Sequence, residues 1–118
     1  MCGIAGSLSV SNFFSEQDFR KASAAIKHRG PDGDGFYSDN FVRLAHRRLS
    51  IIDLDNRASQ PMYSSCMRYV MVYNGEVYNY VELRKEIESE YKDSQLSDFK
   101  TTSDTEVILR LFEIKGVD

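Results

Sequence analysis

Hydrophobic and polar residues alternate from the start of the chain. On one side of this period-two pattern fall Cys2, Ile4, Gly6, Leu8 and Val10. Such alternation is typical of a β-strand, because successive side chains point to opposite faces of a sheet. The pattern therefore predicts a strand that begins at the amino terminus and holds residue 2 at a strand end.

Three later segments repeat apolar residues at helical spacing. Each follows a pair that resembles a capping box, in which side chains three positions apart support the first turn of a helix. The pairs are Ser15 with Asp18, Asn79 with Glu82, and Ser103 with Glu106. We predict helices over about residues 16–28, over about 80–88, and from 104 to a stop at Gly116. The apolar face of the first helix would consist of Phe19, Ala22, Ala25 and Ile26.

Two further segments indicate β structure. Residues 36–38 and 41–45 flank a turn at Asp39 and Asn40, which predicts a hairpin. Residues 68–73 form the most strand-like run of the chain, and this run ends at Asn74 and Gly75. An Asn-Gly pair after a strand is first of all a hairpin-turn signal, so a turn is the default interpretation here. Residues 55–66 and 89–100 are polar and predict loops.

Residues 29–35 contain three glycines and one proline. Such a segment predicts a tight loop whose shape is set by its backbone. It lacks the Gly-Lys-Ser/Thr ending of a P-loop and the strand-to-helix setting of a dinucleotide-binding fingerprint. We therefore assign it no role in phosphate binding.

Composition narrows the classes of function. The chain has 118 residues, enough for one domain at most. Its net charge of -3 gives no basic footprint for nucleic acid or anionic lipid, so the expected partner is a small molecule or another protein. No apolar run approaches the roughly 20 residues of a membrane span, and the amino terminus has no signal-peptide pattern, which predicts a cytoplasmic protein without membrane contact.

The chain has two cysteines, Cys2 and Cys66. In a cytoplasmic protein both are expected to be reduced, and two are too few for a zinc site or a disulfide framework. Cys66 is expected to pack as a small apolar residue. Removal of Met1 would give Cys2 both a thiol and a free α-amine, and an α-amine that titrates near neutral pH can take the proton of the thiol. The alternative is that Met-Cys is only how this chain begins.

Other polar residues have structural alternatives to a role in chemistry. His46 is most simply a structural histidine that satisfies a backbone group. Arg47 and Arg48 would by default lie on a solvated strand face, although an arginine beside a reactive site would hold a carboxylate through two hydrogen bonds. Asp104 suits the first turn of the last helix, where a negative charge is favoured by the helix dipole.

Five motifs occur together and in a fixed order. They are Met1-Cys2-Gly3-Ile4-Ala5-Gly6, His28-Arg29-Gly30-Pro31-Asp32-Gly33-Asp34-Gly35, Ala45-His46-Arg47-Arg48-Leu49-Ser50-Ile51-Ile52-Asp53, Asn74-Gly75-Glu76 with Tyr78-Asn79, and Ser103-Asp104-Thr105-Glu106. Together they resemble the glutaminase domain of the class II glutamine amidotransferases, specifically the asparagine synthetase (glutamine-hydrolysing) branch. The resemblance covers nearly the whole chain, and the Arg-Gly-Pro-Asp loop favours this branch over relatives that make glucosamine 6-phosphate or phosphoribosylamine.

The resemblance implies an α+β fold of the N-terminal nucleophile hydrolase type. This fold is a four-layer αββα sandwich, in which two antiparallel sheets lie between layers of helices. Residues 1–118 would be the N-terminal part of the glutaminase domain, so the sandwich would be incomplete over this length. The synthetase domain of the family is absent from this sequence.

The resemblance also implies the roles of residues in glutamine hydrolysis. Cys2 would be the nucleophile that attacks the side-chain amide, and its freed α-amine would be the base. The side chain of Asn74 and the backbone N–H of Gly75 would form the oxyanion hole. Arg29 is a further candidate for the glutamine site.

The two charged ends of L-glutamine would be recognised by opposite charges. The resemblance implies that Arg48 binds the α-carboxylate and that the backbone around Leu49 and Ile51 helps to seat it. Glu76 and Asp104 would bind the α-ammonium group.

The resemblance implies partners beyond these residues. Ammonia would pass to a C-terminal synthetase domain of the same chain, which would use ATP and Mg²⁺ to amidate aspartate to asparagine, and no cofactor or metal is expected in residues 1–118. A homodimer is compatible with the resemblance. Two alternatives stay open: a different acceptor such as a sugar or a secondary metabolite, and a glutamine-binding or regulatory module without catalysis.

Overall fold

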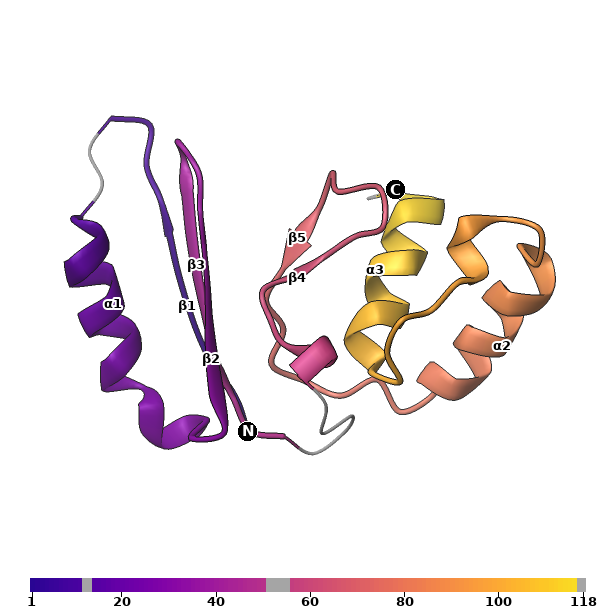
Figure 1. Cartoon of the computed structure of the whole chain (residues 1–118), viewed down its shortest axis with the longest axis horizontal. Coiled ribbons are helices and arrows are strands. Elements are labelled where there is room, and N and C mark those ends of the chain that lie inside the picture. The colour runs from indigo at the N-terminus through magenta and orange to yellow at the C-terminus, as the bar shows by residue number, and fades with distance from the viewer. Residues whose placement is uncertain (12–13, 51–55, 117–118) are drawn as a thin grey trace. The chain divides into compact units, whose positions relative to one another are not determined.

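The structure, a computed structural model, describes residues 1–11, 14–50 and 56–116 and divides into two units (Figure 1). Unit 1 consists of Met1–Ile51, Ser59–Pro61 and Val72–Asn74. Unit 2 consists of Ile52–Ala58, Met62–Met71 and Gly75–Asp118. The mixture of helices with antiparallel sheets confirms the α+β class.

The centre of unit 1 is an antiparallel sheet of three strands in the order β1-β3-β2. The strands are β1 (Gly3–Leu8), β2 (Gly33–Ser38) and β3 (Val42–Arg48). The strand predicted at the amino terminus and the predicted hairpin are therefore confirmed. The Asp39 carboxylate closes the hairpin turn, because its Oδ1 accepts the N–H groups of Phe41 and Val42 at 2.7 and 2.6 Å.

The glycine-rich segment is only partly a loop. Its first half contains the short 3-10 turn η1 (Lys27–Arg29) and Gly30, but Gly33 and Gly35 already belong to β2. A Cβ at Gly30 would lie 2.1 Å from the backbone oxygen of Arg47. The chain can therefore cross β3 closely only because residue 30 has no side chain.

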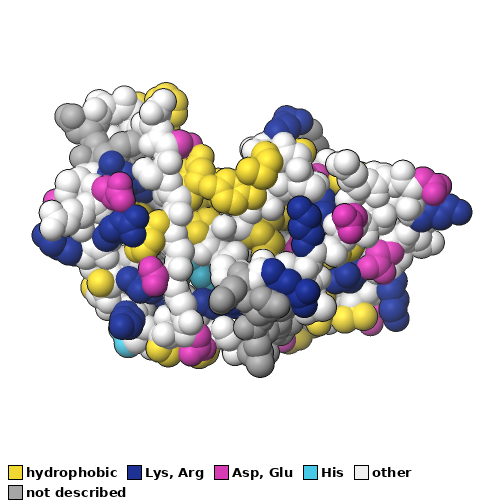
Figure 2. All heavy atoms as spheres, in the orientation of Figure 1, with side chains coloured by type: hydrophobic (Ala, Val, Ile, Leu, Met, Phe, Trp, Pro, Cys, Tyr) yellow, Lys and Arg dark blue, Asp and Glu magenta, His cyan; other side chains and the backbone are white. Residues whose placement is uncertain are grey.

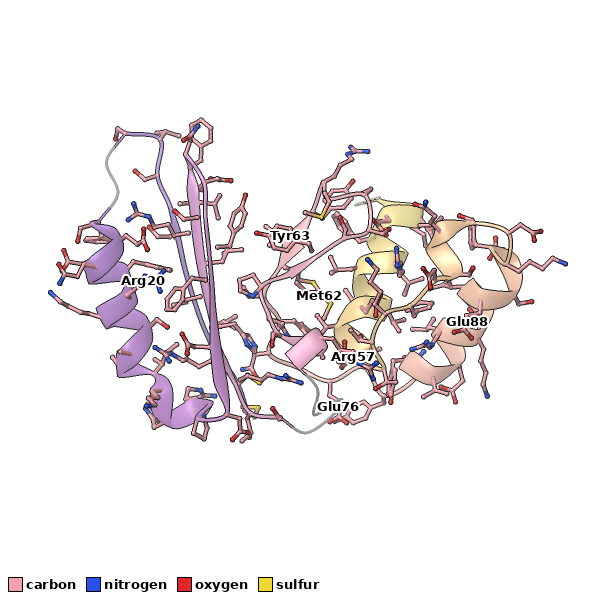
Figure 3. All side chains as sticks on the ribbon, in the orientation of Figure 1. Arg20, Arg57, Met62, Tyr63, Glu76 and Glu88 are labelled. Atoms are coloured by element: carbon pink, nitrogen blue, oxygen red, sulfur yellow. The ribbon has the colours of Figure 1, made fainter. Side chains whose placement is uncertain are left out.

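Helix α1 (Glu16–Ala25) covers one face of this sheet (Figure 1). It begins at the predicted cap, where Ser15 Oγ accepts the N–H of Asp18 at 3.1 Å. Its Arg20 points toward the sheet, with the guanidinium 4.2 Å from the centre of the Phe36 ring (Figure 3). The helix is shorter than predicted, because the chain tightens into η1 after Ile26.

The buried face of α1 differs from the predicted one. Phe19 and Ser23 are buried and Ile26 is half-buried, whereas Ala22 and Ala25 are exposed. These buried positions are four and three residues apart, so they do share one helix face. Ser23 takes the inner position because it is hydrogen-bonded to an arginine of the sheet, which the apolar pattern alone does not reveal.

The two faces of the sheet carry different residues because side chains alternate along each strand. Ala45 and Arg47 of β3 lie on the face covered by α1, and we call the opposite face the second face. His46 and Arg48 lie on the second face, and their cross-strand partners include Ile4 and Gly33. The predicted apolar side of β1 is on this second face and is exposed in part, with Ile4 47% and Leu8 77% accessible.

Unit 2 combines a small hairpin with two helices. The hairpin pairs β4 (Met62–Tyr63) with β5 (Val70–Met71), and the helices are α2 (Tyr80–Glu90) and α3 (Asp104–Lys115). The described part of the unit also contains two 3-10 turns, η2 (Asn56–Ala58) and η3 (Gln95–Ser97). The rings of Tyr69 and Phe112 meet edge to face at 4.8 Å. Among the described residues of this unit, the buried apolar ones are Ala58, Met62, Ile87, Val107 and Leu109.

The strand-like run at residues 68–73 forms much less strand than predicted. Only Val70 and Met71 pair with β4. The backbone groups of a strand need hydrogen-bond partners on a neighbouring strand, and β4 has only two residues to provide them. The hairpin-turn interpretation of Asn74 and Gly75 is wrong, since the next element is α2 rather than a returning strand.

The predicted helix starts of unit 2 are correct in position. Asn79 is the cap of α2, but its side chain makes no capping hydrogen bond, so that capping pair is wrong in detail. Ser103 does cap α3, with its Oγ accepting the N–H of Glu106 at 3.3 Å. Helix α3 ends at Gly116, whose φ of 71° suits glycine, as predicted.

Cys66 is exposed, so the prediction that it packs as an apolar residue is wrong; its N–H donates to the carboxylate of Glu113 on α3 at 2.8 Å. Figure 2 shows hydrophobic side chains among the charged ones at the surface in this view. Among the described residues, no helix has the length and apolar character that a membrane crossing requires.

Candidate active site

The Cys2 thiol lies against the backbone of Leu49. The N–H of Leu49 donates to Sγ at 3.3 Å, and the thiol lies 3.6 Å from the carbonyl oxygen of the same residue. Cys2 is only partly buried, so its sulfur is not enclosed in an apolar core. A backbone N–H directed at sulfur can also hold the negative charge of a thiolate.

Strand register places Cys2 level with Arg48. The pair Gly3–Arg47 is the first of the β1–β3 ladder, so continuing the register by one residue puts Cys2, which precedes β1, opposite Arg48, the last residue of β3. Antiparallel partners point to the same side of a sheet, which puts both residues on the second face. Arg48 is buried there. The thiol and the predicted carboxylate-binding arginine thus come from the same end of the sheet.

The glycine-rich segment supports this end of the sheet. Arg29 Nε donates to the carbonyl oxygen of Cys2 at 3.4 Å. Asp32 donates its N–H to the Arg48 carbonyl oxygen at 3.0 Å, and its carboxylate accepts the N–H of Ser50 at 2.8 Å. Arg29 therefore holds the backbone of Cys2 itself, and Asp32 holds the backbone on both sides of Leu49, the residue that contacts the thiol. The sequence analysis gave Asp32 no role.

Arg47 has a structural role on the opposite face. Its Nε donates to the backbone oxygen and the hydroxyl of Ser23 at 3.1 and 3.0 Å, and its guanidinium lies 3.6 Å from the carboxylate of Asp34. These contacts bind α1 to the sheet. The default of a solvated strand face is therefore wrong for Arg47, which is mostly buried.

His46 is almost fully buried on the second face of the sheet. It is 1% exposed, and its Nε2 lies 3.3 Å from the carbonyl oxygen of Tyr73. The prediction of a structural histidine that satisfies a backbone group is confirmed. Burial lowers the pKa of His46, the contact with Tyr73 opposes this in part, and the charge of Arg48 lowers the pKa further.

Asn74 follows Tyr73 in unit 1, whereas Gly75 begins the part of unit 2 that leads to α2. Glu76 is exposed on that segment (Figure 3). Asp104, the first residue of α3, is buried, and its Oδ2 accepts the N–H of Val77 at 3.0 Å. Asp104 therefore supports the segment after Gly75 and does more than favour the helix dipole.

The predicted site residues thus fall into groups. Cys2, Arg29, Arg48 and Leu49 come together in unit 1, which also contains Asn74, and Gly75, Glu76 and Asp104 belong to unit 2. Ile51 lies outside the described residues. Within the part of the chain that the structure describes, no group of three or more His, Cys, Asp or Glu side chains could hold a metal ion.

Comparison with known proteins gives one family and a consistent set of relatives. The family model described as a glutamine amidotransferase domain matches residues 1–118. Asparagine synthetase [glutamine-hydrolyzing] 1 of Bacillus subtilis is 39% identical over 116 residues, which are 95% of this chain and 17% of that protein. Asparagine synthetase B [glutamine-hydrolyzing] of Escherichia coli is 39% identical over 118 residues, 98% of this chain and 20% of that protein.

A plant relative matches with the same identity and a similar coverage of both chains. The asparagine synthetase [glutamine-hydrolyzing] of Brassica oleracea is 39% identical over 118 residues, 98% of this chain and 19% of that protein. The chain therefore spans about a fifth of the length of these relatives. Since the family model covers every residue, the chain belongs to the glutamine amidotransferase domain family.

Proposed function

We propose that this chain hydrolyses L-glutamine through Cys2 and supplies the ammonia for asparagine synthesis. The observation that carries the proposal is the position of the Cys2 thiol, which contacts the N–H of Leu49 and lies level with the buried Arg48. The names of the relatives, all glutamine-hydrolysing asparagine synthetases, support the reaction and its product.

The proposed reaction has two covalent steps. After removal of Met1, the α-amine of Cys2 takes the thiol proton and the thiolate attacks the side-chain carbonyl carbon of glutamine. The tetrahedral oxyanion is held by the side chain of Asn74 and the N–H of Gly75. The protonated amine gives its proton to the leaving nitrogen, and ammonia departs to leave a γ-glutamyl thioester. Water then attacks the thioester, which releases glutamate and restores the thiol.

Substrate recognition in this proposal uses the two charges of glutamine. Arg48 binds the α-carboxylate, with the backbone around Leu49 and Ile51 alongside, because a guanidinium matches a carboxylate with two parallel hydrogen bonds. Asp104 and Glu76 bind the α-ammonium group. Oδ2 of Asp104 accepts the N–H of Val77, and Oδ1 accepts a long hydrogen bond from the Thr105 hydroxyl at 3.5 Å. Each carboxylate oxygen has a further lone pair for a ligand.

Arg29 has a more specific role in this proposal than in the sequence-based expectation. Its hydrogen bond to the Cys2 carbonyl oxygen favours anchoring of the nucleophile over direct binding of glutamine. The positive charge also lies beside the residue that becomes a thiolate.

The chain is proposed to be the N-terminal part of a glutaminase domain with four layers. The three-stranded sheet and α1 would form two of these layers, and a second sheet would cover the exposed Ile4 and Leu8. A synthetase domain of the full-length protein would receive the ammonia and amidate aspartate. ATP and Mg²⁺ would be used there, and the proposal assigns them no residue of this chain.

The test compares glutamine with free ammonia in the full-length protein. Cys2→Ala should abolish release of glutamate from glutamine, while synthesis of asparagine from added ammonia, aspartate and ATP should continue. The second reaction is the matched control for folding. Release of glutamate at the wild-type rate by Cys2→Ala would refute the proposal. A wild-type protein that binds glutamine without hydrolysing it would instead be a regulatory module. If the full-length protein used ammonia to amidate another acceptor and not aspartate, glutamine hydrolysis would stand but the product would not be asparagine.

A further inference from the structure

Both backbone polar groups of Tyr73 are bonded to side chains of unit 1. Its N–H donates to Oε1 of Gln60 at 2.5 Å, and its carbonyl oxygen contacts Nε2 of His46 at 3.3 Å. Strand β5 ends at Met71, two residues earlier. Beyond the end of β5, hydrogen bonds from these side chains therefore replace those of the strand pair and fix the backbone one residue before Asn74.

The position of Gln60 against the sheet depends on a glycine of β2. Gly35 pairs with His46 across the β2–β3 ladder. A Cβ at Gly35 would lie 2.0 Å from the backbone oxygen of Gln60 and 3.0 Å from Cδ of Pro61. The backbone of residues 60–61 thus lies directly on the second face of the sheet beside His46, an approach that only glycine permits.

The contact between His46 and the Tyr73 carbonyl oxygen requires a neutral imidazole. A carbonyl oxygen can only accept a hydrogen bond, so Nε2 carries the proton. Nδ1 is buried and has no hydrogen-bond partner among the described residues. A proton there would place an unsatisfied donor and a charge inside the protein, next to the charge of Arg48. Nε2 is therefore the ring nitrogen that donates, and it donates to Tyr73.

We propose that His46 and Gln60 form a two-point clamp on Tyr73 that positions Asn74 for catalysis. The inference rests on the proposed role of Asn74 in the oxyanion hole. Donors of this kind must be held within about 0.5 Å of their working position, since their value lies in being oriented before the reaction begins. His46 and Gln60 are positioning residues here, because they act through the backbone of Tyr73 and touch no reacting atom.

The first test separates turnover from substrate binding. His46→Leu and Gln60→Leu should each lower the kcat of glutamine hydrolysis roughly 10- to 100-fold, because a misplacement of about 1 Å can lower the rate about 100-fold, with little change in KM. His46→Gln should recover much of the rate, because its amide can still donate an N–H. Arg47→Leu is the control for loss of stability on the same strand, and it should keep the wild-type kcat while folded.

The second test is a double-mutant cycle with Asn74→Ala. If the clamp acts through Asn74, adding His46→Leu or Gln60→Leu to Asn74→Ala should lower kcat no further. Losses that multiply in the double variants would overturn the inference, and so would a wild-type kcat in both clamp variants. An Asn74→Ala variant with wild-type kcat would instead refute the proposed oxyanion role.

Hydrogen exchange gives a readout that does not depend on catalysis. In wild-type protein, the Tyr73 amide should exchange slowly because its N–H is bonded to Gln60. Gln60→Leu should speed exchange at this amide, while the amides of β1 should stay as protected as before. Unchanged exchange at Tyr73 would mean that the clamp is absent in solution, whatever the kinetics of the Asn74 variant.

Discussion

Arg47 and Arg48 are neighbours in the sequence and have opposite surroundings. Arg47 lies on the face of the sheet that α1 covers, where it binds the backbone and hydroxyl of Ser23. Arg48 lies on the second face, level with Cys2. One residue of register decides the difference, because successive side chains of a strand point to opposite sides.

The two faces of the sheet differ as a whole in the same way. The helix-covered face is a packing surface, with Ala45 fully buried and Arg47 bonded to α1. The second face carries His46, Arg48 and the start of β1, together with the backbone of residues 60–61. Polar residues on the first face hold the fold together, and those on the second face are the candidates for chemistry.

Among variants that test the difference between the two faces, Arg48→Leu is expected to have the largest effect. The kcat/KM for glutamine should fall roughly 10- to 100-fold, mainly through KM, because a hydrogen bond to a charged group contributes about 1.5–3 kcal/mol. Steady-state kinetics of glutamate release over a range of glutamine concentrations would measure the change. Arg47→Leu is the matched control, and an equal loss of kcat/KM in both variants would remove the distinction between the faces.

The next effect concerns stability and should appear on the helix-covered face. Arg47→Leu removes both hydrogen bonds to the buried Ser23, whose carbonyl oxygen keeps the N–H of Ile26 but whose hydroxyl loses its arginine donor, so the free energy of unfolding should fall by about 1–3 kcal/mol. Urea unfolding of the full-length protein, followed by a signal from this domain, would measure it. If Arg47→Leu unfolds at the same urea concentration as wild type, the bonds to Ser23 add nothing to stability.

The smallest effect is the pH dependence that His46 contributes. Burial lowers the pKa of His46 in the folded state, so below the ordinary imidazole value of about 6.5 the unfolded state binds the extra proton first. Stability should therefore fall as the pH drops below about 6.5 and stop falling, for this group, below the folded-state pKa.

The check is a comparison of unfolding free energies at about pH 7.5 and about pH 5.5. The loss at the lower pH should be smaller in His46→Gln than in wild type. His28→Gln should retain the full loss, because His28 is exposed. Equal losses in all three proteins would show that His46 is not held neutral by burial.

Local features could be predicted from the sequence because they depend on neighbouring residues. The caps at Ser15 and Ser103, the hairpin turn at Asp39 and the first strand all follow from short-range patterns. The family could also be predicted, since its motifs are short and ordered.

What the sequence did not reveal depends on contacts between distant segments. Ser23 is buried because it meets an arginine 24 positions away, and an apolar pattern does not register that partner. The Asn74-Gly75 pair predicts a hairpin turn from local sequence alone, because the contacts of Gln60 and His46 with Tyr73 come from distant segments. The different roles of Arg47 and Arg48 follow from strand register, which local propensity does not determine.

The most direct test of the account is to find where a reactive glutamine analogue attaches to the full-length protein. The protein would be treated with a glutamine-like diazo-ketone, with and without excess glutamine, and its peptides analysed by mass spectrometry. We expect one adduct, on a Cys2 that has become the first residue, and protection by glutamine. Cys66 is exposed and serves as the internal control. Labelling of Cys66 alone, or of neither cysteine in a protein that still releases glutamate, would contradict the assignment of Cys2 as the nucleophile.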